Sequence, residues 1–224
     1  MPEPVHVHAP RELSETPEHA SRRERLLELA AAILMALATV AIAWSGYQAA
    51  RWSGLQAQRD AEANAARAEA NDARTLAAEQ RLEDLTNFNR WLELSTEGNV
   101  VLASLYEARF RREFRPAFDA WLAEDPLLDP TATPSPLRED EYQLAANDEA
   151  ERREDAAAES FDEGREATEN GDHYVFTTVF LAAVLFFAGI SLRFNWMPMR
   201  IAILVLAAVF FGAGLVQLFS LPVR

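Results

Sequence analysis

The sequence contains no cysteine, so disulfide bonds and thiolate metal sites are excluded. It contains no lysine either. All 21 basic residues are arginines, which we interpret as genome composition rather than chemistry. The net charge of −14 is opposite to the basic surface that a general nucleic-acid-binding protein needs, so we expect no nucleic-acid partner.

Motifs of catalysis are also missing. The 224 residues hold no HExxH motif, phosphate-binding glycine loop, EF-hand spacing or Ser/His/Asp pattern. His6, His8 and His19 lie in the proline-rich segment 1–25, which has too few large apolar residues to order itself and which we interpret as a loosely ordered tail. We therefore predict no catalytic residue, no metal site and no cofactor, and the protein is not expected to be an enzyme.

Three long apolar runs, in contrast, are conspicuous. Leu29–Tyr47, Tyr174–Leu192 and Ile201–Leu221 are each roughly 20 residues without a charged side chain, the length that a helix needs to cross a bilayer core of ~30 Å. We predict transmembrane helices at 26–50, 173–193 and 198–221, of which the last two form a hairpin. Charged side chains are missing from all three runs, which disfavours an ion-coupled transporter or a proton relay.

Arginines set the expected orientation. Arg22, Arg23 and Arg25 precede the first run, and the turn at 193–200 carries Arg193 and Arg200 without an acid. The positive-inside rule places both segments in the cytoplasm and residues 51–172 outside it, in a multi-pass protein of the bacterial cytoplasmic (inner) membrane. A cleavable signal peptide is the alternative, but the first run is longer than a typical signal core and the helical pattern continues beyond it.

Aromatic residues flank the runs where a membrane-interface belt is expected. The belt comprises Trp44, Tyr47, Trp52, His173 and Tyr174. For His173 the alternative role is to sense pH or to pair with an acid. For the repeated Trp-Ser-Gly element at residues 44 and 52 the alternative is a ligand site.

The region 51–172 carries 14 arginines and 29 acids, a net charge of −15. We predict helices at 51–97, 100–123 and 138–172, separated near Gly98 and by the proline-rich loop 124–136. In the first helix a seven-residue repeat suggests a coiled-coil seam. Its two rows are Ala61, Ala68, Thr75, Leu82 and Asn89, and Asn64, Asn71, Ala78, Leu85 and Leu92.

The segment 100–123 has an aromatic stripe at four-residue spacing, which is typical of a helix face in a core, with a ligand groove as the alternative. The stripe runs through Leu102, Tyr106, Phe110, Phe114 and Phe118 and ends with Trp121 and Leu122.

A row of arginines flanks the predicted seam. Arg67, Arg74 and Arg81 are seven residues apart, and the segment 138–172 holds 14 acids against 4 arginines. Coiled coils place interhelical charges at such flanking positions. We predict that the row faces acids of this segment, with two solvated charge sets as the alternative. The candidate acids are Glu151, Glu154, Asp155, Glu159 and Asp162.

Small residues four apart in the membrane runs favour close helix contacts between copies or with another membrane protein. Ala32 and Ala36 form one such pair, and Ala208 and Gly212 form the other. We therefore expect the lipid bilayer, and either a homo-oligomer or a membrane-protein partner, as the interactions of this chain.

The order of parts resembles an uncharacterised bacterial family of three-span membrane proteins of unknown function. The matching pieces are Trp44–Ala57 and Phe176–Leu221, about a third of the chain. The family has an N-terminal span, a charged helical region and a C-terminal two-span hairpin, so the resemblance implies this architecture and no activity.

Together these patterns predict an all-α membrane protein with three transmembrane helices and an outward-facing antiparallel helical stalk. The expected function is that of a non-enzymatic structural or interaction protein, such as an accessory subunit or an envelope scaffold. The alternative is a sensor or receptor-like protein whose outward helices bind a ligand and which signals through a separate cytoplasmic protein.

Overall fold

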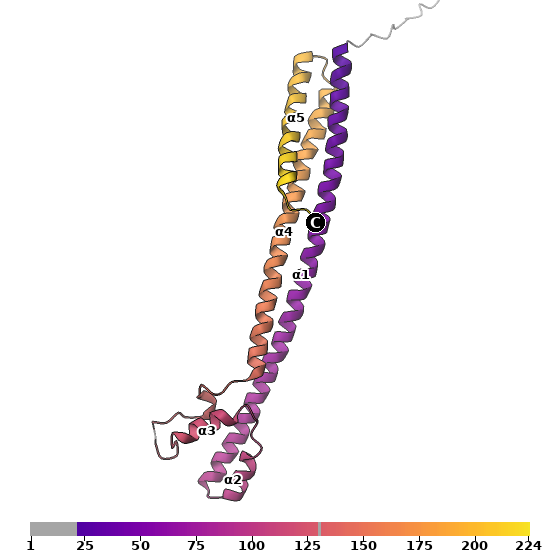
Figure 1. Ribbon diagram of the computed structural model, residues 1–224. Helices are drawn as coiled ribbons and strands as arrows, with labels where there is room; N and C mark the ends of the chain where they lie inside the picture. The colour runs from indigo at the N-terminus through magenta and orange to yellow at the C-terminus, as the bar shows by residue number, and fades with distance from the viewer. Residues whose placement is uncertain (1–21, 130) are drawn as a thin grey trace, which may run out of the picture. The chain divides into compact units, whose positions relative to one another are not determined.

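The computed structural model describes residues 22–129 and 131–224, and within them all regular structure is helical. The α-helices are α1 (Arg22–Thr96), α2 (Val100–Glu107), α3 (Arg115–Ala123), α4 (Ala145–Ser191) and α5 (Met197–Ser220), and η1 (Pro136–Arg138) is a 3-10 helix (Figure 1). The all-α class is thus confirmed. Of the predicted tail, residues 22–25 belong to α1, and His6, His8 and His19 lie outside the described residues.

Three of these helices, α1, α4 and α5, are long and apolar enough to cross a membrane. The predicted spans fall on these helices. With 75 residues at 1.5 Å each, α1 is roughly 110 Å long. That length is more than three times the ~30 Å hydrocarbon core, so most of α1 extends beyond any membrane it crosses.

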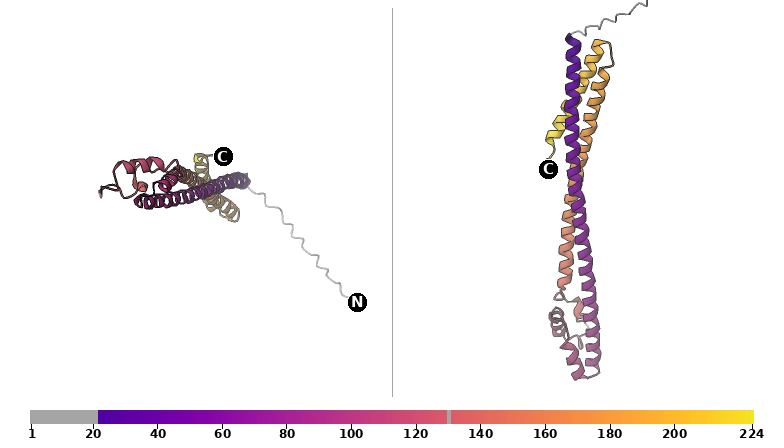
Figure 2. Two further views of the ribbon diagram at one scale, coloured as in Figure 1. Left: turned by 90° about the horizontal axis from the view of Figure 1, so that it is seen from below. Right: turned by 90° about the vertical axis from the view of Figure 1, so that its right-hand side faces the viewer.

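The chain divides into two compact units. The described residues of 1–49 and 172–224 form the first, which we call the three-helix unit, and residues 50–171 form the second, the acidic unit. In the three-helix unit, α4, α5 and the first part of α1 run side by side (Figures 1 and 2). Its centre is small and apolar, with Ala38, Val184, Ala188 and Ala207 all fully buried.

Glycine permits the closest approach in the three-helix unit. A Cβ added at Gly214 of α5 would lie 3.0 Å from Leu181 Cδ2 of α4. The small residues singled out from the sequence lie elsewhere. Ala32, Ala36 and Ala208 are exposed, and a Cβ added at Gly212 would meet nothing within 4 Å. Their predicted role in contacts between molecules stays a prediction.

In the acidic unit, α1 and α4 lie side by side (Figure 2), but α1 does not use the predicted seam to pack against α4. The buried row is Ala63, Ala70 and Ala77, which lies between the two predicted rows and coincides with neither, and Leu82 is 65% exposed. Both rows repeat every seven residues, so periodicity alone does not choose between them. The alanine row is the one buried against α4 because α4 contributes equally small residues, and two such surfaces can approach closely. On α4 these are Ala150, Ala157 and Gly164.

The contact at Gly164 yields a prediction. A Cβ there would lie 3.2 Å from Asp60 Oδ1 and 3.4 Å from Arg59 Cβ, so a Gly164→Leu side chain must push the helices apart. Overpacking, partly offset by better helix propensity, should lower the free energy of unfolding by about 1–2 kcal/mol. The measurement is thermal melting by circular dichroism. Gly54→Leu is the control, because nothing lies within 4 Å of its Cβ position, and equal melting temperatures would contradict the tight seam.

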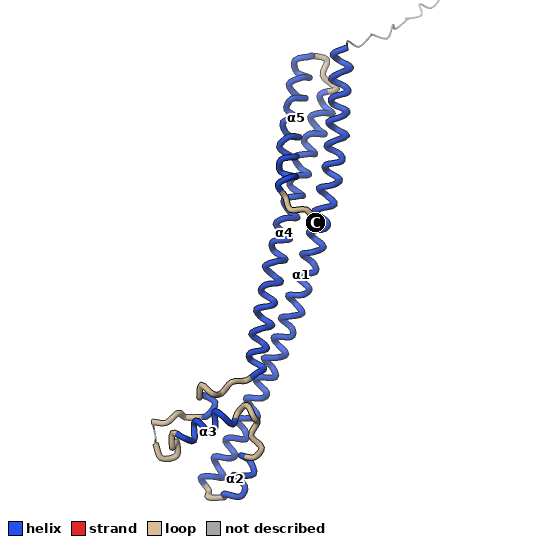
Figure 3. Tube along the Cα trace, in the orientation of Figure 1, coloured by secondary structure: helices blue, strands red, loops and turns tan. Residues whose placement is uncertain are grey.

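The predicted single helix 100–123 is also wrong, because the chain breaks into α2 and α3. Pro116 disfavours a helix that continues through it from residue 112 and so fixes the start of α3. It lacks an N–H, and its ring clashes with the carbonyl four residues earlier, so proline belongs in the first turn of a helix. It occupies that place in α3. The third predicted helix likewise begins later than expected, at Ala145, after η1 and a turn (Figure 3).

The break lets the aromatic stripe fold onto α1 as a core. We call Phe88, Trp91, Phe110, Phe114, Phe118 and Trp121 the aromatic cluster; all six are at most 6% exposed. Their rings meet mostly edge to face, for example Trp91 and Phe118 at 4.8 Å between centroids. The Trp121 indole N–H donates a hydrogen bond to the Thr133 carbonyl at 2.6 Å, which ties the loop to the cluster. Phe110, Phe114, Phe118 and Trp121 of the stripe therefore lie in a core, as expected, whereas Tyr106 is half-buried and Leu102 and Leu122 are exposed.

Candidate functional site

Asp84 is the least expected side chain of the acidic unit. It lies on α1 one heptad after Ala77 and one before Trp91, in the row that faces inward, and it is only 1% exposed. An ionised carboxylate at such depth loses its hydration and needs charged or hydrogen-bonding partners.

Two partners from other parts of the chain approach the same oxygen. Arg111, in the turn between α2 and α3, places Nη1 3.3 Å from Asp84 Oδ2. The Tyr142 hydroxyl donates a hydrogen bond to this oxygen at 3.1 Å. Arg111 also pairs with Glu113, whose side chain is the more exposed of the two. The Tyr142 ring packs edge-on against the Phe114 ring, with 6.0 Å between the ring centroids. We call Asp84, Arg111 and Tyr142 the buried polar triad.

Burial dominates the electrostatics of the triad. It raises the pKa of Asp84, while the Arg111 charge and the Tyr142 hydrogen bond lower it, and the net direction is upward. Burial and the neighbouring Asp84 also raise the pKa of Tyr142, which keeps its hydroxyl protonated and donating. The triad thus joins α1 to the α2–α3 turn and to the segment before α4, and its protonation is sensitive to how well water is excluded.

No sequence motif marks the triad. The one available signal was Asp84 itself, a carboxylate that continues the spacing of Ala63, Ala70 and Ala77. That signal is visible only once this row is chosen as the buried one. Arg111 and Tyr142 have no local pattern, because their contacts with Asp84 depend on the break at Pro116 and the turn before α4.

The structure separates the three members of the predicted arginine row. Arg74 forms an ion pair with Glu154 of α4, one of the candidate acids. The Arg67 guanidinium lies 5.3 Å from the centroid of the Phe161 ring, a cation–π contact with the same helix. Arg81 is exposed and acts on the triad at longer range, where its charge lowers the pKa of Tyr142.

The Arg74 pair is about half exposed on both sides, so its contribution is small. An Arg74→Glu variant should lose only ~0–1 kcal/mol, and Arg74→Glu with Glu154→Arg should recover it. Protease cleavage near the loop 124–129 at low ionic strength is a sensitive readout. The effect should vanish near 1 M salt, where the screening length falls to ~3 Å. An equal cleavage rate in the single and double variants would mean that the two charges do not interact and are simply solvated.

The residues of the predicted belt occupy different environments. Trp44 and Tyr47 are 45% and 51% exposed and pack on each other at 5.9 Å between ring centroids. His173 is exposed and Trp52 is buried. Tyr174 is fully buried. Its hydroxyl donates to the Pro222 carbonyl at 3.1 Å, and its own carbonyl accepts from Ser45 Oγ at 2.8 Å, so it fastens α4 to α1 and to the segment after α5.

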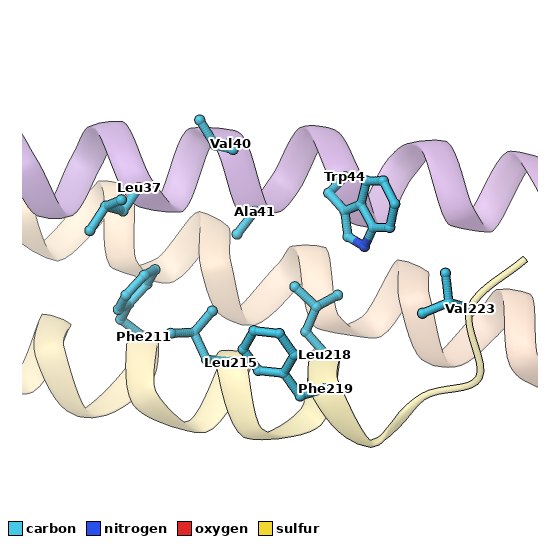
Figure 4. Close-up of a pocket in the computed structure, with 9 residues that line it drawn as sticks. All are labelled: Leu37, Val40, Ala41, Trp44, Phe211, Leu215, Leu218, Phe219 and Val223. Atoms are coloured by element: carbon cyan, nitrogen blue, oxygen red, sulfur yellow. The ribbon is translucent and has the colours of Figure 1, made fainter.

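An apolar groove of ≈ 510 Å³ runs between α1 and α5 beside Trp44 (Figure 4). Every lining side chain is hydrophobic, and the groove contains no titratable group. It suits acyl chains or another apolar helix rather than a polar substrate. The lining residues are Leu37, Val40, Ala41, Trp44, Phe211, Leu215, Leu218, Phe219 and Val223.

Arg200, at the start of α5, is only 9% exposed. Its Nη2 lies 3.4 Å from Glu28 Oε1 near the start of α1. This pair connects the predicted cytoplasmic turn to the beginning of the first span.

Among the described residues, no group of three or more His, Asp or Glu side chains is arranged to hold a metal ion. No family model, curated protein or solved structure matches the chain, so the resemblance drawn from the sequence stays a prediction.

Proposed function

We propose that this chain is a non-enzymatic structural or interaction protein of the bacterial inner membrane, an accessory subunit or envelope scaffold. The observation that carries the proposal is the build of α1 and α4. Each continues without a break from a membrane-length apolar stretch into the acidic unit. Such helices display a soluble surface at a membrane. The buried polar triad and the aromatic cluster stabilise the acidic unit.

In this proposal α1 and α4 form an antiparallel stalk outside the membrane. The order of their contacts supports that arrangement. Arg59 pairs with Glu163 at 2.8 Å, and Arg74, further along α1, pairs with Glu154, earlier in α4. Asp84 and Tyr142 continue the same sequence of pairs towards the aromatic cluster.

A sensor is the second candidate, and the buried polar triad favours it. The raised pKa of Asp84 means that its charge depends on burial, so a ligand or partner that opens this site would change it. A sensor of this kind needs a separate cytoplasmic protein to carry its signal.

Photo-crosslinking in intact membranes, followed by affinity capture of the full chain, tests the function. A photoreactive residue at exposed Val101 of α2 probes the outer surface, and one at exposed Arg193 probes the opposite turn. Capture of an envelope or membrane complex through Val101 supports the scaffold. Reproducible capture of a signalling protein at Arg193 supports the sensor. Turnover of a small molecule by the purified chain would overturn both.

The orientation is testable by itself. A reporter inserted after Leu128, which is 87% exposed, and one fused after Arg224 should both report the extracytoplasmic side. The physical reason is the arginine content of the predicted cytoplasmic segments. Replacing the exposed Arg22, Arg23 and Arg193 with glutamine serves as the control, because it should weaken this preference. A cytoplasmic signal after Leu128 in the unmodified chain would contradict the topology.

A further inference from the structure

The seven-residue rows that the sequence displays most clearly on α1 face away from α4. We call the surface formed by Ala61, Asn64, Ala68, Asn71, Thr75, Ala78, Leu82 and Leu85 the outer face; all eight side chains are exposed. At 100° per residue, Ala61 lies roughly 200° around the helix from the buried Ala63. α1 therefore carries two heptad faces on nearly opposite sides, and α4 covers only one of them.

The outer face has the composition of a coiled-coil contact. Its small side chains allow close approach, and asparagines at seam positions fix register at some cost in stability. Leu82 and Leu85, 65% and 38% exposed, are its largest apolar groups. Uncharged, mostly small side chains repeat in both rows at seven-residue spacing from residue 61 to residue 85, a pattern that a solvated helix surface does not require.

Charges along the two edges of the outer face complement each other. Arg67 and Arg74 lie on one edge, and Asp72 and Glu79 lie on the other, each acid five residues after an arginine. In a parallel two-stranded coiled coil, a side chain at the g position meets the e position five residues further along the other strand. The two acids form no ion pair among the described residues. A guanidinium has five N–H donors, so Arg74 can bind a second acid beside Glu154, and Arg67 can bind an acid with its in-plane N–H groups while its face lies over Phe161.

We propose that a second copy of this chain packs on the outer face as a parallel coiled coil over residues 61–85. Arg67 and Arg74 of each copy then pair with Asp72 and Glu79 of the other. The parallel direction rests on the proposed function, since two copies inserted in one membrane share their orientation. The contact is isologous, which closes the assembly as a dimer.

The absence of cysteine makes the test direct. Ala68→Cys and Thr75→Cys place thiols where a parallel, in-register dimer brings identical positions together, within the 4.4–6.8 Å Cα separation of disulfides. Leu76→Cys is the matched control, since it is 47% exposed but lies on another side of α1. After oxidation in membranes, disulfide-linked dimers are expected at 68 and 75 and not at 76. Equal yields at all three positions, or none at 68 and 75, would overturn the proposal.

Charge exchange tests the edges of the outer face. Asp72→Arg with Glu79→Arg should lower the dimer yield at Thr75→Cys roughly five-fold through like-charge contacts. Co-expression with a copy that carries Arg67→Glu and Arg74→Glu should restore a mixed dimer. Restoration supports the pairing, and an unchanged yield in the first variant overturns it. Capture of a different protein without any self-crosslink would leave the proposed function standing and remove the dimer.

Discussion

Phe114→Ala should unfold the α2–α3 part of the acidic unit at much milder denaturation than the parent. Phe114 is fully buried and meets Phe88, Phe110, Phe118 and Tyr142 with its ring. Truncation of a buried phenylalanine costs about 3–5 kcal/mol, because transfer energy is lost and a cavity remains. The aromatic cluster is small, so few neighbouring side chains could move to fill such a cavity.

Near-ultraviolet circular dichroism of the full chain in detergent is a suitable measurement, since the aromatic cluster holds two tryptophans in edge-to-face contacts. The helical signal of the three-helix unit should persist while the aromatic signal is lost earlier. Leu128→Ala provides the control, because that side chain is 87% exposed. If both variants melt with the parent, the cluster is not the core of the acidic unit.

Asp84→Ala should be the second most damaging change. It removes the acceptor of the Tyr142 hydroxyl and leaves Arg111 with Glu113 alone. Removal of one member of a buried ion pair costs about 3–5 kcal/mol, and the remaining Glu113 contact puts the expected loss near the lower limit, about 3 kcal/mol. Urea unfolding followed by protease sensitivity measures it. Glu83→Ala, an exposed neighbour on α1, should be nearly neutral, and an equal loss there would refute the role of the triad.

Asp84→Asn separates charge from hydrogen bonding. The amide retains an acceptor for Tyr142 but cannot titrate. Because the pKa of Asp84 is raised on folding, the folded state binds a proton more tightly than the unfolded state, and stability falls as pH rises. The parent should therefore lose stability relative to Asp84→Asn from its ordinary pKa of 3.8 upward to the raised value. Other carboxylates cancel in this comparison, and a constant difference between about pH 3 and 7 would exclude a raised pKa.

Much of the fold follows from the sequence, and the errors have definite causes. Uncharged apolar runs of membrane length identified α1, α4 and α5, since few other structures use them. The face of α1 that packs on α4 is not the predicted one, because two faces of α1 share one period and the choice between them depends on the small residues of a distant helix, around Ala157. Pro116 indicates the break between α2 and α3, but the regular spacing of the aromatic residues favours a single helix, and that prediction is wrong.

The candidate site is much harder to predict from the sequence than the fold. Asp84 lies in a region of many acids, and nothing local marks it as the buried one. Its burial results from the α2–α3 turn that brings Arg111 close and from the segment that brings Tyr142, and these are tertiary consequences. The contact of Arg74 with Glu154 followed from charge spacing, whereas the position of Arg67 over Phe161 did not.

The nested order of the pairs between α1 and the returning chain has a kinetic consequence. Asp84 and Tyr142 are 58 positions apart, Arg74 and Glu154 are 80 apart, and Arg59 and Glu163 are 104 apart. Closing each loop from the open chain costs more entropy than the one inside it. Once the inner pair has formed, however, the next pair closes only a short remaining segment. Folding of the acidic unit should therefore nucleate at the aromatic cluster and propagate along α1 and α4 towards residue 50. Formation of the aromatic cluster should be the slow step.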